Sequence, residues 1–434
     1  MALSYSTRNK RNAAFIETCN AMSVDDFGGS HEVRDAILAL RPFFQGEIIF
    51  PSNKDYDADR MLSNPVFQFH PIVILYCKTE VDAALALGLC RDQGLPFSVR
   101  SGGHCTAGFS GNNGVMIDVK NLNGILIDED AKTAVCGTGV EFGDFQQALD
   151  PYHLNVPGGE CADVCVGGYV QGGGFGFTAA KYGISCDNVI EVRVLLADGT
   201  VAVSNKDKNP ELLWAVCGGT GGNFGILLTV KFQLHDLDKC YGFALDWALD
   251  TDQEVEQAAQ ALCYLQNDYM LNSVAGPDLT LQLHIGFQYV DDSKTKMKPF
   301  LMVRGLWAGD VGQGPDVIAP LKALPGMLRD HFWEAVDTFY VMNHKLLHYP
   351  QGMPPMPPGP DPLEDKSSHY VTRDLALGEW QQMLGFMKTS LPNKSFAYME
   401  VYGGAIAERD RLSNAFVHRD AAFNLILDVF WKDD

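Results

Sequence analysis

The segment that decides the first part of the fold runs from Pro71 to Arg100 and reads PIVILYCKTEVDAALALGLCRDQGLPFSVR. Its apolar run at 72–76 predicts a buried strand, and the acidic turn after Thr79, followed by apolar residues at helical spacing, predicts a helix. The run at 97–100 predicts a second strand, which opens directly onto the loop SGGH at 101–104. The segment therefore predicts a strand-helix-strand unit that ends in a glycine loop able to present backbone N–H groups to an anion.

The pattern of elements changes near residue 236. Before it we expect strands at 114–119, 124–127, 133–137, 189–196, 200–204 and 224–234, a helix at 142–149, and another helix that Asn209 caps. After it glycine becomes rarer and longer elements alternate, which predicts a second domain. There we expect helices at 251–270 and 376–389, strands at 279–289, 299–306, 331–340 and 395–402, and a proline-rich surface loop at 350–362.

The composition excludes several classes of protein. The 434 residues, 46% of them apolar, can bury a large core in two or more substructures. A formal net charge of −21 would repel a phosphate backbone, so we expect no nucleic-acid partner. Residues 1–20 hold no secretory apolar run, no later run is long enough to span a membrane, and the odd number of cysteines, eleven, fits reduced thiols. We therefore expect a soluble cytoplasmic protein without a membrane partner.

Two glycine-rich segments, at 167–176 and 218–225, carry the next signal. A dinucleotide fingerprint needs a strand before the glycines and a helix after them, whereas Gly218 follows a predicted helix and precedes a predicted strand. Neither segment ends in Gly-Lys-Ser or Gly-Lys-Thr, so a P-loop is excluded too. Taken alone, the glycines fit tight turns as well as they fit a nucleotide site.

A series of short strings in one order distinguishes these alternatives. The strings are RSGGH at 100–104, GECADV at 159–164, GGYVQGGGFG at 167–176, DG at 198–199, LWA at 213–215 and GNFG at 222–225. The series resembles the berberine-bridge-enzyme-like branch of the vanillyl alcohol oxidase family, which has a PCMH-type FAD-binding domain and includes the oligosaccharide oxidases. The resemblance is strong over 71–234 and looser beyond. It implies an α+β fold with a two-part FAD-binding domain at 1–235 and a substrate domain at 236–434, in which helices cover an antiparallel sheet.

The resemblance also implies FAD that is attached covalently at two residues. In the family the histidine of RSGGH bonds to the 8α methyl group of the isoalloxazine, and the cysteine of GxCxxV bonds to the neighbouring ring carbon. The matching residues are His104 and Cys161, although by themselves they would fit a loop cap and a core position. Cys165 replaces a glycine of the family, and we expect it to be structural. A zinc site formed by these residues and Cys186 would lack a second close pair of ligands, so we predict no metal.

Further cofactor contacts follow from the same strings. Glycines let backbone N–H groups approach a pyrophosphate, Arg100 can fix the loop that follows it, and the segment after Gly222 resembles the part that reaches the adenosine end. The predicted cofactor-binding residues are Arg100, Ser101, Gly102, Gly103, His104, Cys161, Val164, Gly168, Gly172, Gly173, Gly174, Phe175, Gly176, Asn223, Gly225 and Ile226.

The chemistry implied is hydride transfer to the flavin while a base removes a hydroxyl proton. In the family's oligosaccharide-oxidase-like members the base is a tyrosine of a C-terminal Tyr-x-Asn-Tyr-like segment that returns to the FAD domain, and no such string occurs here. The strand MEVYGG at 399–404 resembles the family's strand over the flavin. Glu400 and Tyr402 project to one face of it, and we predict them as catalytic residues. The alternative is a half-exposed strand with a solvated carboxylate. Phe175 stands where many relatives have tyrosine, so that hydroxyl is absent.

These features predict an FAD-dependent oxidase that acts on an alcohol or hemiacetal carbon of a carbohydrate-like small molecule and reduces dioxygen to hydrogen peroxide. Val164 supports dioxygen as the electron acceptor, because relatives with a small valine beside the flavin tend to act as oxidases. The alternatives are a tailoring oxidase or dehydrogenase of a secondary metabolite and, from another class, a flavin-binding module without turnover. Aromatic residues that would line a sugar groove, unless they are core residues, are Trp247, Trp307, Trp333, Tyr340 and Tyr349.

Overall fold

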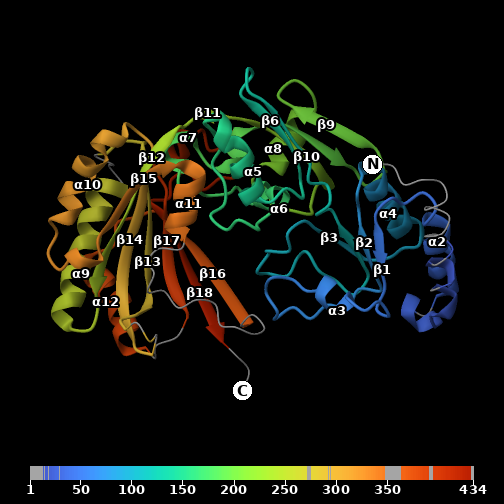
Figure 1. The fold of residues 1–434 in the computed structure, drawn as a ribbon, viewed down its shortest axis with the longest axis horizontal. Coiled ribbons are helices and arrows are strands. Elements are labelled where there is room, and N and C mark those ends of the chain that lie inside the picture. The colour runs from blue at the N-terminus through green and yellow to red at the C-terminus, as the bar shows by residue number, and fades with distance from the viewer. Residues whose placement is uncertain are drawn as a thin grey trace.

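The computed structural model describes residues 13, 15–17, 19–28, 30–270, 275–291, 293, 295–347, 363–390 and 394–431. The described residues form a four-stranded, a five-stranded, a two-stranded and a seven-stranded sheet. Figure 1 shows the seven-stranded sheet in the half away from the N-terminus, with helices on its outer side and further helices between the two halves. The predicted α+β class is therefore confirmed. Within the described residues no helix is long and apolar enough to cross a membrane. Tyr349 and the proline-rich stretch 350–362 lie outside the described residues.

The first sheet contains the predicted strand-helix-strand unit and has the order β1-β2-β4-β3. Strands β2, β4 and β3 are parallel, so their carboxyl ends meet at one edge, and β1 is antiparallel to β2. Helix α4 begins after Thr79, as predicted, because the Thr79 hydroxyl accepts from the Asp82 N–H and the Asp82 carboxylate accepts from the Thr79 N–H. The elements of this part are α2 (His31–Leu40), β1 (Glu47–Ile49), α3 (Tyr56–Asp59), β2 (Val73–Tyr76), α4 (Glu80–Asp92), β3 (Phe97–Arg100) and β4 (Val115–Asp118).

The second sheet is antiparallel and has the order β5-β6-β10-β8-β9. The predicted turn at Asp198-Gly199 joins β8 to β9. Asn209 occupies the predicted N-cap position before Pro210, but its side chain makes no capping hydrogen bond, because the residue is left-handed, with φ 50°, and its amide donates to the Val203 carbonyl. The elements are β5 (Ile125–Asp128), β6 (Thr133–Gly137), α5 (Phe142–Leu149), β7 (Leu154–Asn155), α6 (Val166–Gln171), α7 (Ala179–Tyr182), β8 (Val189–Leu195), β9 (Val201–Asn205), α8 (Pro210–Val216), β10 (Ile226–Gln233) and β11 (His235–Asp236).

The large sheet has seven antiparallel strands in the order β15-β12-β14-β13-β17-β18-β16. Its side chains alternate between two faces. The outer face, with residues such as Leu283, Met399 and Phe423, packs against α9 and α12, and the inner face is turned toward the other two sheets (Figure 1). The elements are β12 (Lys239–Ala248), α9 (Asp252–Leu265), β13 (Leu279–Tyr289), β14 (Met297–Trp307), α10 (Gly314–Lys322), β15 (Trp333–Thr338), α11 (Phe339–Leu347), β16 (Leu363–Val371), α12 (Leu377–Thr389), β17 (Phe396–Val401), α13 (Ala405–Glu408) and β18 (Phe423–Trp431).

Two predicted elements of this part need correction. Helix α9 ends at Leu265, and residues 266–270 continue as a π-helical turn. The predicted strand 331–340 gives way to α11 at Phe339, because Phe339, Met342 and Leu346 bury one side of a helix. Strands β12, β16 and β18 have no counterpart among the predicted elements, and β16 carries polar residues on both faces.

The chain returns to the second sheet between β17 and β18. Tyr402, Ile406, Phe416 and Ala421 belong to the hydrophobic core of that sheet. Gly404 allows the crossing, because a Cβ there would lie 2.3 Å from the Ala180 carbonyl oxygen. Both halves of the molecule therefore contribute to the region around Tyr402, and the domain boundary at 235/236 stays a prediction.

Candidate active site

The glycine loop after β3 offers unused hydrogen-bond donors. Within the described residues the backbone N–H groups of Gly102, Gly103 and His104 donate no hydrogen bond. Gly103 has a φ of +76°, which turns the loop away from the strand direction. The Ser101 hydroxyl donates to the Thr138 carbonyl at 2.6 Å and so ties the loop to the second sheet. The loop is held in place while its donors stay available to an oxygen-rich ligand.

Arg100 supports this loop from behind. Its side chain is buried, and its Nε lies 2.5 Å from Oδ2 of Asp118 on the neighbouring strand. Its Nη1 donates to the Met61 carbonyl at 3.1 Å. The guanidinium is therefore occupied within the protein, and Arg100 acts on the loop through the strand.

The second glycine segment continues into α6. Gly168, in the first turn of that helix, has open space where a Cβ would point. Gly176 has the opposite environment, since a Cβ there would lie 2.3 Å from the Gly158 carbonyl oxygen. This close approach packs the segment against the loop that carries Cys161. Gly172, Gly173 and Gly174 lie between these positions, at the C-terminal end of α6.

The two thiols of the 161–165 loop differ in exposure. Cys161 is exposed, whereas Cys165 is buried and directs its Sγ toward the Gly139 carbonyl. Desolvation by the protein around Cys161, followed by the negative charges of Glu160 and Asp163, raises the pKa of its thiol to about 11. Oδ2 of Asp163 lies 3.3 Å from Nε2 of His104. The loop that carries Cys161 therefore contacts the loop that carries His104.

The remaining predicted cofactor residues differ in how far they are buried. Asn223 is exposed and its amide donates to the Gly219 and Thr220 carbonyls, while Ile226 is buried at the start of β10, so its side chain is closed to a ligand. Gly225, with a φ of +128°, connects the two. Phe175 is buried and stacks on Tyr402, with ring centroids 5.7 Å apart.

A row of five polar residues crosses the inner face of the large sheet. Adjacent strands are paired so that each member lies opposite the next one. The row runs through β14, β13, β17, β18 and β16 as Arg304, Gln282, Glu400, Asn424 and Tyr370. Strand pairing alone therefore gathers a guanidinium, two amides, a carboxyl and a phenol.

Glu400 occupies the middle of this row. The only hydrogen bond to its carboxylate from the described residues comes from the Asn424 amide, at 3.3 Å. Burial raises the pKa of Glu400 to about 7, with a further contribution from the Glu160 carboxylate, while the Asn424 hydrogen bond and Lys366 oppose the rise. A carboxyl with this pKa exchanges its proton near neutral pH, which suits a general base.

Tyr402 lies just after the end of β17, two residues beyond Glu400. It is buried between Phe175 and Tyr370, and burial together with the Glu400 charge raises the pKa of its phenol well above the ordinary value. Its hydroxyl therefore stays protonated and can donate a hydrogen bond. Of the two predicted catalytic residues, Glu400 has the properties of a proton acceptor.

A second polar group lies further along the inner face. Lys366 bridges Glu364, at 3.0 Å, and Asp428, at 2.9 Å. Asn424 Oδ1 and Asp428 Oδ1 are buried and accept no hydrogen bond within the described residues. Two acceptors without donors on one strand fit a ligand that carries hydroxyl or N–H groups.

Several inner-face residues were outside the sequence prediction. Gln282, Arg304, Tyr370, Asn424 and Lys366 come from strands far apart in the chain. A signal existed in 279–289, where Thr280, Gln282 and His284 alternate with leucines. That alternation marks a polar face but does not show what the face meets.

The predicted aromatic groove is wrong for two of its members. Trp247 and Trp307 belong to the apolar core on the outer face of the large sheet, where the Trp247 indole donates to the Pro325 carbonyl. Trp333 packs against a separate core cluster, and Tyr340 lies in α11. Aromatic residues that do lie near Glu400 are Tyr169, Tyr370, Tyr398 and Tyr402.

Comparison with known proteins decides the family. A family model described as an FAD binding domain matches residues 71–205. The uncharacterized FAD-linked oxidoreductase YvdP of Bacillus subtilis (strain 168) is 31% identical over 400 residues, which cover 89% of this chain and 82% of the relative. The chain belongs to the FAD-linked oxidoreductases.

Two further similarities extend this result. This chain is 35% identical to (R)-6-hydroxynicotine oxidase of Paenarthrobacter nicotinovorans over 203 residues, which cover 46% of this chain and 44% of the relative. The solved structure of BBE-like 1 from Physcomitrella patens superposes with a TM-score of 0.79 over 93% of this chain and 84% of that chain, at 20% identity. The latter comparison shows a shared fold, and the expected resemblance to the berberine-bridge-enzyme-like branch is confirmed.

The site residues of this FAD-linked oxidoreductase fit the cofactor. The loop at 102–104 has three unused N–H donors, Gly168 leaves open space at the start of α6, and the Cys161 thiol is exposed. Donors of this kind suit a pyrophosphate, and an exposed cysteine suits a covalent link.

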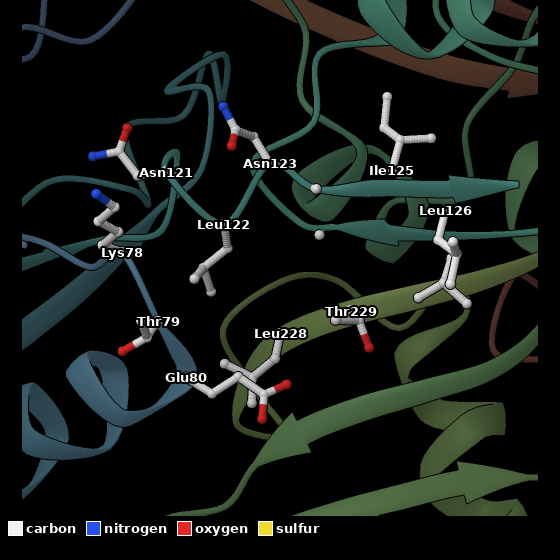
Figure 2. A pocket seen from close by; sticks show the side chains of 13 residues that line it. Lys78, Thr79, Glu80, Asn121, Leu122, Asn123, Ile125, Leu126, Leu228 and Thr229 are labelled. Atoms are coloured by element: carbon white, nitrogen blue, oxygen red, sulfur yellow. The ribbon is translucent and has the colours of Figure 1, made fainter. Parts of the chain in front are cut away.

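Figure 2 shows a separate hollow of about 390 Å³ near the carboxyl ends of β2 and β4. Its lining includes Lys78, Asn121, Leu122 and Leu228. None of its lining residues belongs to the predicted FAD or catalytic set.

Proposed function

We propose that this FAD-linked oxidoreductase is an oxidase of an alcohol or hemiacetal carbon on a carbohydrate-like small molecule. FAD, when bound, would supply the acceptor for a hydride from that carbon, and dioxygen would take up the electrons and leave as hydrogen peroxide. The observation that carries the proposal is Glu400, a recessed carboxyl with a pKa of about 7 on the inner face of the large sheet. The unpartnered acceptors Asn424 Oδ1 and Asp428 Oδ1 support a substrate rich in hydroxyl groups.

In the proposed reaction Glu400 takes the proton of the substrate hydroxyl. Asn424 holds the Glu400 carboxylate through its amide, and Tyr402, whose phenol interacts with that of Tyr370, stays neutral beside it. General bases of this kind contribute about 10²- to 10⁴-fold in rate. Proton removal by Glu400 would leave the neighbouring C–H bond ready to release a hydride.

The proposal includes covalent attachment of FAD through His104 and Cys161. Both side chains are partly open to solvent, and Asp163 brings their loops together. The proposal also assigns Val164 to the reaction with dioxygen, because a small side chain beside the flavin would leave room for the gas.

The decisive experiment is a substrate panel with two readings. Purified protein is mixed anaerobically with mono- and oligosaccharides, and flavin bleaching is followed near 450 nm; admission of dioxygen should then restore the colour and produce peroxide. Bleaching without peroxide on reoxidation would indicate a dehydrogenase. Absence of bleaching with every alcohol, sugar and amine would favour a flavin-binding module without turnover.

A second candidate is a tailoring oxidase or dehydrogenase of a nitrogen-containing secondary metabolite. It is favoured by the 35% identity to (R)-6-hydroxynicotine oxidase, which covers nearly half of each chain. Faster bleaching by cyclic amines than by any sugar would select this candidate.

A further inference from the structure

The residue before Cys161 is held by the large sheet. Oε2 of Glu160 lies 2.8 Å from Nη2 of Arg304, and the Gln282 amide donates to Oε1 of Glu160 at 2.7 Å. Arg304 also donates from its Nε to Oε1 of Gln282, at 2.6 Å, which closes a ring of three side chains. Glu160 belongs to the FAD-binding half, whereas its two partners belong to strands β13 and β14.

Arg304 is itself fixed by further contacts. Its side chain is 8% exposed, its Nη1 donates to the Leu346 carbonyl at 2.5 Å, and its guanidinium lies 5.4 Å from the centre of the Phe177 ring. A planar guanidinium with three fixed partners has little freedom to rotate. Glu160 therefore meets a rigid partner.

The preceding residue is anchored as well. The Gly159 carbonyl accepts hydrogen bonds from the Asn343 amide at 3.2 Å and from the Gln146 amide at 3.1 Å. Asn343, on α11, also donates to Oε1 of Gln146 on α5, and both residues are buried. The main chain and the side chain that lead into Cys161 are thus both fixed from outside the loop.

We propose that Glu160, Gln282 and Arg304 form a clamp that positions the Cys161 thiol for its bond to the flavin. The proposal rests on the proposed attachment of FAD through Cys161. It makes Glu160, Gln282 and Arg304 positioning residues and makes the second covalent link depend on docking of the two halves. His104 lies on the β3 loop and, within the part of the chain that the structure describes, makes no hydrogen bond or ion pair with Glu160, Gln282 or Arg304, so we expect its link to form independently.

The covalent step balances as follows. Cys161 loses its thiol proton and forms one S–C bond to a ring carbon of the flavin, and that carbon loses its hydrogen as a proton. The two electrons released pass to dioxygen, which with the two protons leaves as hydrogen peroxide. The geometry of approach governs this step, because the sulfur must meet one ring carbon.

The charges around Cys161 allow a positioning effect of Glu160 to be distinguished from an electrostatic effect, because the two change the attachment rate in opposite directions. Glu160 and Asp163 raise the pKa of the thiol, while Lys366 and Arg304 lower it. If Glu160 acted on Cys161 through its charge alone, its neutralisation would favour the thiolate and accelerate attachment. The clamp requires the opposite result, because neutralisation weakens the contact with Arg304.

The test uses the full chain as Glu160→Gln and Arg304→Lys variants. Arg304→Lys keeps the charge but loses the planar fork. The matched control is Lys298→Gln, which removes an ion pair with Asp250 at the other end of β14. Apoprotein is incubated with FAD and dioxygen, and the flavinyl peptides of His104 and Cys161 are quantified over time by mass spectrometry. The His104 peptide in the same sample reports that the FAD site is folded.

We expect both variants to form the Cys161 link about 10- to 100-fold more slowly, as small misplacements do in oriented reactions, while the His104 link and the control stay at the parent rate. Formation of the Cys161 link at the parent rate or faster in Glu160→Gln overturns the clamp and leaves the proposed attachment standing. Loss of both links in Glu160→Gln and Arg304→Lys also overturns it, because the role would then be general folding. A parent protein without the Cys161 peptide overturns the attachment and the clamp together.

Discussion

The two faces of the large sheet are made by the same strands, but the outer face packs in an apolar core and the inner face carries polar groups. On the outer face Leu283, Met399 and Phe423 are fully buried beneath α9 and α12. On the inner face their immediate neighbours Gln282, Glu400 and Asn424 are polar and are turned toward the FAD-binding half, where Gln282 donates to Glu160. The difference shows that one set of strands can stabilise the fold with alternate residues and leave the others free for chemistry.

The largest expected effect comes from the centre of the inner face. Glu400→Gln should lower the rate of flavin reduction by about 10²- to 10⁴-fold, because the amide cannot accept a proton. Folding and FAD content should stay at the parent level, since the amide has nearly the same shape. Stopped-flow reduction and flavin quantification check this, with Glu256→Gln on α9 as the control. A variant that reduces its flavin as fast as the parent on every substrate would remove Glu400 from the reaction.

The next effect compares neighbours on opposite faces of β18. Phe423→Ala on the outer face should lower the free energy of unfolding by about 3–5 kcal/mol through the cavity it leaves. Asn424→Ala on the inner face should cost about 1 kcal/mol for one hydrogen bond. Urea unfolding of both variants measures the difference. Equal losses would mean that the two faces do not divide stability and chemistry as described.

A third effect is the dependence on pH. The pKa of Glu400 in the folded protein is about 7, above the value of about 4.3 for an unperturbed glutamate. The folded state therefore holds the proton more tightly, so this group's contribution to stability is present below about pH 4.3 and is lost as the pH rises through 7. Flavin reduction should rise over the same range, because only the carboxylate accepts a proton. Asn424→Ala should move the rate profile to higher pH, and an unshifted profile would contradict the role of that hydrogen bond.

The smallest expected effect lies at Val164, on the FAD side of the site. Val164→Ile adds one methylene group and should slow reoxidation by dioxygen by a few-fold while leaving reduction by substrate nearly unchanged. The two half-reactions are separated by stopped-flow. Equal slowing of both would argue against a gas path beside Val164.

The sequence alone determined the local features of the FAD-binding half. The strand-helix-strand unit at 71–100 and its capping box are set by residues within one turn of each other, and the family strings identify the glycine loops and the two thiols of 161–165. The polar face of β13 was also open to prediction, because alternation along one strand is a local property.

Only the tertiary structure decided which polar residues share the site. Arg304, Gln282, Glu400, Asn424 and Tyr370 lie on five strands, and a shift of one residue in any pairing would turn a member to the other face. The contact of Glu160 with Arg304 joins residues 144 positions apart in the chain. Register and docking depend on packing across the whole molecule, and no local pattern encodes them, which is why the sequence indicated the flavin but left most of the groups around Glu400 to the fold.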